Sequence, residues 1–215
     1  IQNVKSLVDN YYNKIFGGLT RMLNIFIQNN LEKEVEEFCF CIYKPLEILL
    51  KQQKLELRII SIDHIGYICN LYKSDPKHLR RFYNDYECVF EYTKAKFLQF
   101  LQKLNIFDFI FGENIHEAII ERSYYILSFL YTNQLFSQEQ ISYMWKISQS
   151  KYTSISNSII SLFGKLLPEF SNNECNAILQ TVFNLKYNEV NETTLKLLEN
   201  FFISEKRHEN LLNIL

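Results

Sequence analysis

Glycine and proline are so scarce in this 215-residue sequence that few fold classes are open to it. The chain holds 5 Gly and 3 Pro, about 4 % of its residues where about 12 % is usual. An all-β chain needs a turn about every ten residues and draws on these residue types to make it. Eight such residues could hardly supply those turns. We therefore predict an all-α protein.

Size and charge narrow the classes of partner. Hydrophobic residues make up 47 % of the chain, and a chain of this length buries about 70 % of its unfolded surface, so a sizeable core is available. The 23 Lys and Arg residues balance 24 Asp and Glu residues. Such a balance exerts no net pull on phosphates or anionic lipids, so we predict neither nucleic acid nor membrane as a partner. No apolar run reaches the length of a membrane span, and the N-terminal residues lack a signal-peptide pattern.

The cysteines indicate a reducing compartment. Five are present, an odd number, and they lie within apolar runs without regular spacing. A secreted protein would be left with an unpaired thiol, so we interpret them as reduced core residues of a cytoplasmic protein with a possible nuclear share. They are Cys39, Cys41, Cys69, Cys88 and Cys175.

Start and stop signals divide the chain into about ten helices joined by short loops. Pro45 predicts the start of a short helix, because proline is tolerated at a first helical position. Asp75-Pro76 predicts the start of a long one that ends near Asn105. Further helix caps are expected at Asn114, Ser137, Ser171 and Asn191. The other predicted helices cover 3–16, 18–29, 31–44 and 54–73, with the Pro45 helix ending near 53. The helix over 54–73 places Leu55, Ile59, Ile62, Gly66 and Cys69 on one stripe.

Apolar periodicity in the second half predicts which helix faces are buried. The predicted faces consist of Ile155, Ile159, Leu162, Phe163 and Leu166; Cys175, Ile178, Leu179, Val182 and Phe183; and Leu195, Leu198 and Phe202. Between 114 and 203 helix pairs recur about every 50 residues, near the armadillo and HEAT range of about 40–47. The pattern favours an armadillo/HEAT-like α-solenoid of antiparallel helix pairs over a closed bundle, which remains the alternative. Because the chain begins at Ile1 and not at Met, and ends at Leu215 within an apolar pattern, we expect it to be a segment of a longer protein.

Cysteine and histidine are the residues of this chain that could form a reactive centre or a metal site. A thiol protease needs a cysteine and a histidine close in space, and His64, His78, His116 and His208 are available. Every cysteine, however, lies in a helical apolar pattern and not where a thiolate is favoured. Cys39 and Cys41 cannot share a metal ion, because helical residues two apart point about 200° away from each other. We predict no catalytic residue, no cofactor and no metal site.

Two further features each have a structural and a functional interpretation. A basic and aromatic cluster could meet a phosphate or an acidic surface, but we favour a solvated helix face. It consists of Lys77, His78, Arg80, Arg81, Tyr83 and Tyr86, and its acidic counterpart is Glu32, Glu34, Glu36 and Glu37, which suits the first turns of a helix. Trp145, the single tryptophan, is interpreted as a core residue and not as a ligand anchor.

Several segments resemble the non-catalytic N-terminal region of giant ubiquitin-specific proteases of the fat-facets type. Residues 119–130 resemble a family helix of the form L-x-x-I-L-x-F-L, and 135–145 resemble L-[ST]-x-x-x-[IL]-x-x-[IL]-W, with Trp145 on the tryptophan. Leu104-Asn105-Ile106, Phe109 and 115–117 agree with the same order, and 54–62 resemble L-x-x-R-[IL]-x-[AG]-[IL]. The resemblance covers about 54–202. It divides a single helical-repeat segment, 1–215, into N-terminal helices over 1–53, family-like repeats over 54–203 and the start of a further helix over 204–215.

The resemblance implies an armadillo-like scaffold from an enzyme that removes ubiquitin from substrates. The family's catalytic run, of the type Asn-x-Gly-x-Thr-Cys, is absent, since neither Cys88 nor Cys175 stands in such a context. We therefore expect a non-catalytic segment that binds proteins: ubiquitinated substrates, adaptors or ubiquitin itself. The oligomeric state is left open. The alternatives are an armadillo/HEAT adaptor unrelated to ubiquitin and, more weakly, a closed all-α enzyme or small-molecule binder.

Overall fold

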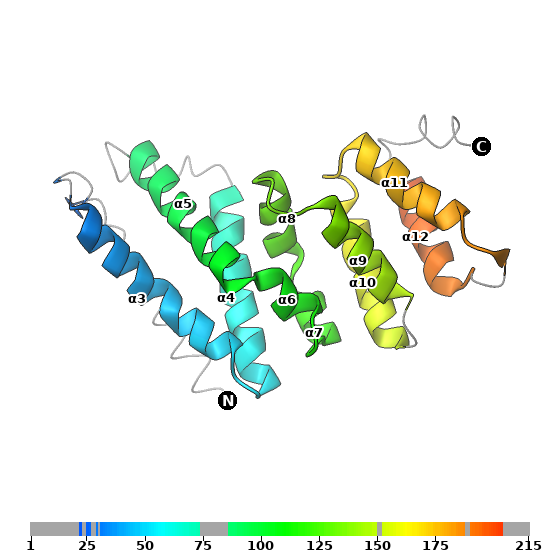
Figure 1. The fold of residues 1–215 in the computed structure, drawn as a ribbon, viewed down its shortest axis with the longest axis horizontal. Helices are drawn as coiled ribbons and strands as arrows, with labels where there is room; N and C mark the ends of the chain where they lie inside the picture. The colour runs from blue at the N-terminus through cyan, green and yellow to red at the C-terminus, as the bar shows by residue number, and fades with distance from the viewer. Residues whose placement is uncertain are drawn as a thin grey trace. The chain divides into compact units, whose positions relative to one another are not determined.

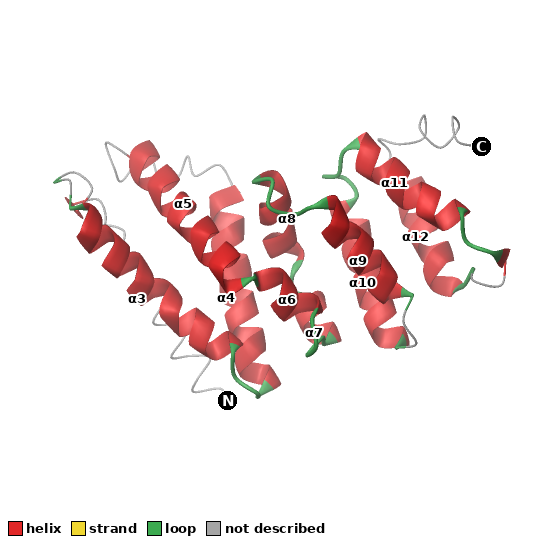
Figure 2. Cartoon of the chain, viewed as in Figure 1, coloured by secondary structure: helices red, strands yellow, loops and turns green. Residues whose placement is uncertain are grey.

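The computed structural model describes residues 31–73, 86–149, 152–187 and 190–203, together with Met22, Ile25, Phe26 and Asn29. Its helices are drawn in Figures 1 and 2, and the described ranges contain no strand, which confirms the predicted all-α class. The chain separates into two compact units, Ile1–Phe109 and Ile110–Leu215. None of the described helices is long and apolar enough to cross a membrane.

The first unit contains α3 (Glu32–Leu50), α4 (Leu55–Lys73) and α5 (Tyr86–Leu104). α3 packs against both α4 and α5. The predicted helix over 54–73 is confirmed as α4. The predicted helix over 3–16 and the start at Asp75-Pro76 lie outside the described residues, as does 18–29 apart from Met22, Ile25 and Phe26, which are helical, and Asn29.

The prediction of a new helix at Pro45 is wrong. α3 continues through Pro45 to Leu50, so that the two expected helices are one. Proline inside a helix costs about 3 kcal/mol, because it removes one backbone hydrogen bond and crowds the preceding turn. Val35, Ile42, Leu46 and Leu50 nevertheless form one buried stripe on both sides of it. Burying this continuous stripe outweighs the local cost.

α4 is buried over a wider arc than its predicted single stripe. The expected face through Ile62, Gly66 and Cys69 is buried, but Ile60, Ser61, Ile65 and Ile68 are buried as well. A buried hydroxyl needs a hydrogen-bond partner. Ser61 Oγ donates to the carbonyl oxygen of Leu46 at 2.8 Å, which joins α4 to α3 beside the proline.

α5 ends where the backbone of Asn105 takes a positive φ of 52°. Asparagine tolerates this left-handed conformation better than most residues, so it is a common helix terminator. The short helix α6 (Ile106–Phe111) begins at the next residue. The predicted end near Asn105 is confirmed.

The second unit is arranged around α10 (Thr153–Leu166). This helix packs against α7 (Glu117–Ile120), α8 (Tyr124–Thr132), α9 (Gln138–Ser148) and α12 (Glu192–Ile203), while α11 (Asn172–Phe183) packs against α9. Of the predicted α10 face, Ile159, Leu162, Phe163 and Leu166 are buried and Ile155 is partly exposed. Trp145 is also buried, in agreement with its interpretation as a core residue.

The expected continuous helix over 119–130 is interrupted. The Arg122 guanidinium donates to the carbonyl oxygen of Ala118 at 2.8 Å, and Ser123 Oγ donates to that of Ile119 at 2.7 Å. These two carbonyls would otherwise accept the backbone N–H groups of Arg122 and Ser123. The N–H groups bond instead to Ile119 and Ile120, at 3.2 and 3.0 Å. Side-chain competition of this kind separates α7 from α8.

Three of the four caps predicted in the second unit are confirmed. Ser137 and Ser171 each form a capping box, with Gln140 and Glu174 respectively. Asn191 Oδ1 accepts the backbone N–H of Thr194 at 3.0 Å. The fourth cap is His116 and not Asn114: its Nδ1 accepts the N–H of Ala118 at 3.2 Å at the start of α7.

The predicted apolar faces of the last two helices need correction. On α11 Cys175, Ile178, Leu179 and Val182 are buried, but Phe183 is exposed. On α12 the buried residues are Thr194, Leu197 and Phe201, one position before the predicted Leu195, Leu198 and Phe202. Both stripes of α12 are apolar except at Thr194. Periodicity alone therefore could not tell which of them faces α10.

Candidate functional site: a groove between α3 and α5

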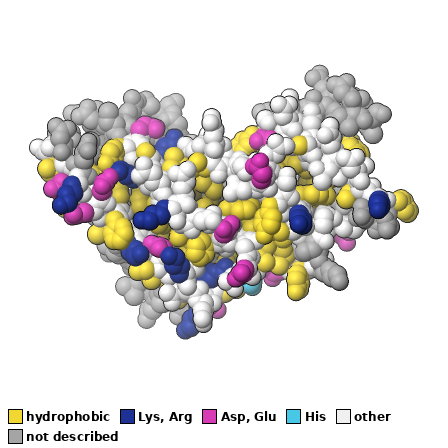
Figure 3. All heavy atoms as spheres, in the orientation of Figure 1, with side chains coloured by type: hydrophobic (Ala, Val, Ile, Leu, Met, Phe, Trp, Pro, Cys, Tyr) yellow, Lys and Arg dark blue, Asp and Glu magenta, His cyan; other side chains and the backbone are white. Residues whose placement is uncertain are grey.

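Helices α3 and α5 border a groove of about 430 Å³ on the surface of the first unit. Its walls combine aromatic and aliphatic side chains with lysines and glutamates. In the space-filling view, Lys and Arg side chains are interspersed with hydrophobic ones on this part of the molecule (Figure 3). The lining residues are Glu36, Cys39, Phe40, Tyr43, Lys44, Glu47, Lys51, Lys96, Gln99, Phe100, Lys103 and Leu104.

Helical spacing explains why these residues gather in one place. Positions three and four apart lie on the same face of a helix. On α3 and its C-cap the groove residues run from Glu36 to Lys51 in steps of one, three and four, and on α5 they run from Lys96 to Leu104 in steps of one and three. The α3 stripe lies beside the buried stripe of Val35, Ile42 and Leu46. One face of α3 thus packs inward while the next borders the groove.

Aromatic rings form the floor. The ring of Tyr43 lies 5.0 Å from that of Phe100, nearly parallel, and 5.3 Å from that of Phe97. Tyr72 of α4 extends this cluster, with its ring 5.6 Å from Phe97. Aromatic pairs at these separations add about 0.5–1.5 kcal/mol beyond area burial. The floor is therefore attached firmly to the core of the unit.

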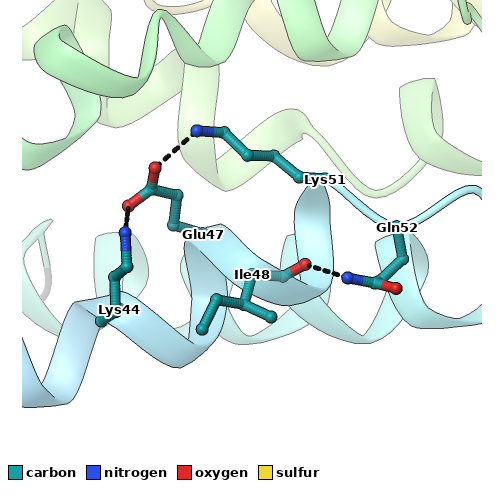
Figure 4. A network of polar contacts seen from close by, with 5 residues as sticks. All are labelled: Lys44, Glu47, Ile48, Lys51 and Gln52. Carbon is teal, nitrogen blue, oxygen red and sulfur yellow. Dashed lines mark hydrogen bonds and ion pairs between the residues drawn. The ribbon is translucent and has the colours of Figure 1, made fainter.

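A three-residue charge network forms one end of the rim (Figure 4). The Glu47 carboxylate accepts from Lys44 Nζ at 3.0 Å and from Lys51 Nζ at 2.5 Å. Its pKa is lowered, chiefly by the bond from Lys51 and then by that from Lys44. The network carries two positive charges and one negative charge, so this end of the groove has an excess positive charge.

Lysines of α5 line the opposite wall. Lys96 is paired with Glu36 of α3 across the groove, and this hydrogen bond raises the pKa of Lys96. Lys96 Nζ also lies 5.3 Å from the centre of the Tyr92 ring. Among the described residues Lys103 is in no ion pair. In total, four lysines face two glutamates in the groove lining.

Among the apolar side chains that line the groove, Phe40 is the most exposed. It belongs to the groove wall and is 59 % exposed. Lys44 Nζ lies 5.7 Å from the centre of its ring. The Phe40 ring is therefore a surface group beside a cation and not a core residue.

The groove does not have the chemistry of a thiol active site. Cys39 lies in its wall, but the side chain is buried. Burial raises its pKa to about 11, and the opposing effect of Lys96 is smaller. A thiol with such a pKa is almost entirely protonated at neutral pH and is a poor nucleophile. Within the described ranges no group of three or more His, Cys, Asp and Glu residues could hold a metal ion.

The cysteines differ in burial, although the same prediction was made for all of them. Cys39, Cys69 and Cys175 are buried, as predicted, whereas Cys41 is exposed. The helical geometry that prevents Cys39 and Cys41 from sharing a metal ion also places one of them outside. The side chain of Cys88 lies beyond what the structure describes.

The basic and aromatic cluster singled out in the sequence cannot be placed. Lys77, His78, Arg80, Arg81 and Tyr83 lie outside the described residues, and Tyr86 is described only as the first residue of α5. Of the acidic cluster, α3 does begin at Glu32, and Glu36 contributes to the groove. Sequence reasoning missed the groove itself. The available signal was a pair of lysines seven residues apart on each of two helices, 44 and 51, then 96 and 103.

The family described as the UBP24/USP9X/USP9Y ARM repeat matches residues 49–206. The chain belongs to this ARM-repeat family. It is thus an armadillo-like helical scaffold region of a USP9X-type ubiquitin-specific protease, and the resemblance seen in the sequence is confirmed. Most of α3 precedes the matched range, whereas α4 and α5 lie within it. No curated protein and no solved structure matched the chain.

Proposed function

We propose that this ARM-repeat chain is a non-catalytic docking module, which holds a protein partner close to the catalytic domain of its protease. The observation that carries the proposal is the family match together with the exposed aromatic and charged groove between α3 and α5. The partners we propose are ubiquitinated substrates, adaptors or ubiquitin. Tethering a partner raises its effective concentration at a distant site without any new chemistry.

A competition assay tests this role. The intact parent protease is given ubiquitinated proteins isolated from its source cells, or a small fluorogenic ubiquitin conjugate that needs no docking. Added in excess as a separate protein, the 215-residue chain should slow cleavage of the protein conjugates severalfold, because it occupies their docking sites. It should leave cleavage of the small conjugate unchanged. Equal slowing of both substrates would assign the docking to ubiquitin itself, whereas no effect on either would contradict the docking role.

Two further measurements test whether the chain is non-catalytic and whether its parent protein is a ubiquitin-specific protease. The 215-residue chain alone should not cleave ubiquitin conjugates. Turnover that disappears when one of its cysteines is replaced by serine would overturn the non-catalytic assignment. The open reading frame of the parent gene should contain a cysteine box and a histidine box after the region encoding residue 215. An adaptor unrelated to ubiquitin would have neither box.

A further inference from the structure

The groove between α3 and α5 combines three properties that together specify a ligand. It has an apolar aromatic floor, an exposed aromatic ring at its wall and a rim of lysines. We propose that it binds an acidic amphipathic helix of a partner protein, with apolar residues against the floor and carboxylates toward the lysines. This inference deepens the proposed docking function and rests on it.

The charge balance of the rim favours an acidic partner. The lining contains Lys44, Lys51, Lys96 and Lys103 against two glutamates, an excess of two positive charges. The whole chain carries a net charge of −1. The groove therefore stands out locally from a chain that is otherwise slightly acidic. Complementary charge of this kind increases the association rate and selects against basic partners.

Three lysines of the rim could pair with carboxylates of a partner. Lys44 and Lys51 share the single carboxylate of Glu47, so a partner carboxylate would relieve the repulsion between them. Lys103 has no carboxylate partner within the described part of the chain. Lys44 and Lys51 are seven apart, as are Lys96 and Lys103, and seven residues are about two helical turns. Carboxylates spaced two turns apart on a partner helix would match this interval.

The dimensions of the groove suit a helix. Its α3 wall extends from Glu36 to Lys51, which is about 22 Å at 1.5 Å per residue. A helix of about 15 residues has that length and would present four turns. An amphipathic helix that lays its apolar face into such a groove is a common mode of peptide recognition. The exposed ring of Phe40 and the partly exposed ring of Phe100 provide the aromatic surface that is enriched at protein interfaces.

A nucleic acid is a poorer match. Single strands stack their bases on aromatic side chains within basic channels, and this groove does have rings and lysines. However, Glu36 and Glu47 lie among the lysines, at positions where a phosphate backbone would meet their carboxylates. A protein helix can place its own charges to avoid these two carboxylates, whereas a uniformly charged backbone cannot.

The test uses the 215-residue chain and three labelled peptides of 15 residues in fluorescence anisotropy. The acidic probe has Leu or Phe at i, i+3, i+4, i+7 and i+11, with Glu and Ala elsewhere. One comparison peptide has Lys in place of Glu, and the other has Ser in place of Leu and Phe. The acidic amphipathic probe should bind at least tenfold more tightly than either. Its affinity should fall as NaCl is raised, because salt screens rim charges.

Matched variants assign the binding to the groove. Lys44→Glu with Lys103→Glu should weaken binding of the acidic probe at least tenfold. Lys33→Glu with Lys54→Glu makes the same change in net charge outside the groove lining and should alter affinity less than twofold. Phe40→Ala tests the apolar part separately and should weaken binding severalfold without changing charge. All these side chains except that of Lys44 are largely solvent-exposed, and circular dichroism confirms that each variant is folded.

Several outcomes would overturn the proposal. Equal binding of acidic and basic peptides, or an unchanged affinity in the Lys44→Glu, Lys103→Glu variant, would exclude charge-directed recognition at this groove. Binding of a 15-nucleotide oligouridylate as tight as that of the acidic probe would assign the groove to nucleic acid. Self-association in sedimentation that this variant abolishes would assign it to a second copy of the chain. If the same variant still competes in the protease assay, the docking function stands and only the groove assignment fails.

Discussion

At the scale of single residues, Cys39 and Cys41 show how helical geometry controls thiol reactivity. They are two positions apart, yet one is buried and the other exposed. Burial raises the pKa of Cys39 to about 11 and that of Cys69 well above its ordinary value. A protonated, buried thiol reacts slowly with disulfide reagents. In a Cys88→Ser chain we therefore expect about one thiol to react rapidly with a chromogenic aromatic disulfide at pH 7.5.

That rapid thiol should be Cys41, so Cys41→Ser should abolish the fast phase. The remaining thiols should react at least a hundredfold more slowly and become available in concentrated urea. A fast phase that persists in the Cys41→Ser chain would contradict the burial of the other three cysteines.

Gly164 marks a close contact between α10 and α12. A Cβ at this position would lie 2.8 Å from Asn200 Nδ2 and 2.9 Å from Asn200 Cγ, well inside van der Waals contact. Alanine favours a helix over glycine by about 1 kcal/mol, but forcing an extra carbon into a packed contact costs about 1–3 kcal/mol. We expect Gly164→Ala to lower the free energy of unfolding by about 1 kcal/mol. The measurement is urea denaturation followed by circular dichroism.

Gly164→Ala should stabilise the protein once the side chain of Asn200 is removed. In an Asn200→Ala chain, Gly164→Ala should raise the free energy of unfolding, because only its gain in helix propensity remains. A double-mutant cycle gives the coupling between the two sites. A coupling energy near zero would show that the side chain of Asn200 moves aside without cost.

At the scale of elements, the carboxylate of Glu169 attaches the turn after α10 to α8. Both Glu169 oxygens accept from Ser128 Oγ, at 2.8 and 2.7 Å, and Oε1 accepts from Tyr124 Oη at 2.7 Å. Ser128 is completely buried, so removing the Glu169 carboxylate takes two hydrogen bonds away from a buried hydroxyl, which is costly. We expect Glu169→Ala to lower the free energy of unfolding by about 1–3 kcal/mol, measured by urea denaturation.

The control for Glu169 removes its donors first. In a Tyr124→Phe, Ser128→Ala chain, the loss caused by Glu169→Ala should be much smaller, because no buried donor then depends on it. Glu199→Ala, an exposed glutamate on α12, should have little effect in either chain. Equal losses at Glu169 in both backgrounds would show that this contact is not coupled to α8.

The elements also show which local signals in the sequence were reliable. Caps at Ser137, Ser171 and Asn191 were predictable because the cap and its partner lie within three residues of each other. Pro45 and the 119–130 segment were not. In the first case tertiary burial overrides a local helix breaker, and in the second Arg122 and Ser123 interrupt a segment of good helical periodicity. Neither outcome depends on the residue types alone.

At the scale of the molecule, the fold class followed from composition, but the groove did not. Few glycines and prolines already require helices, and the armadillo assignment followed from helix spacing and family resemblance. The groove depends on α3 and α5, which are separated in the sequence by α4, so its two walls become neighbours only on folding. The lysines at 44, 51, 96 and 103 read individually as ordinary solvated charges. On α12, likewise, only packing identifies the buried stripe.

Among the described residues, each unit has a tyrosine whose strongly raised pKa makes its stability depend on alkaline pH. Tyr72 in the first unit has its pKa raised to about 12, mainly by burial, and that of Tyr124 in the second is raised to about 12 by burial and by Glu169. An unfolded tyrosine has a pKa of about 10. Because the folded pKa is higher, the neutral hydroxyl is favoured by folding. This stabilisation is fully present below pH 10 and is lost as the pH rises through 12.

We therefore expect the free energy of unfolding, measured in urea at a series of pH values, to fall between about pH 10 and 12. Cys39 and Cys69 contribute with the same sign, since their folded pKa values are also raised, so the comparison must be made between chains with the same cysteines.

Tyr72→Phe and Tyr124→Phe should each make the decline shallower. Tyr187→Phe removes a hydroxyl from an almost fully exposed side chain and should not. The side chain of Tyr124 is partly exposed, so solvent screening should reduce its contribution to the pH dependence. Tyr72→Phe should therefore have the larger effect. A decline that is equally steep in all three variants would mean that alkaline unfolding begins elsewhere in the chain.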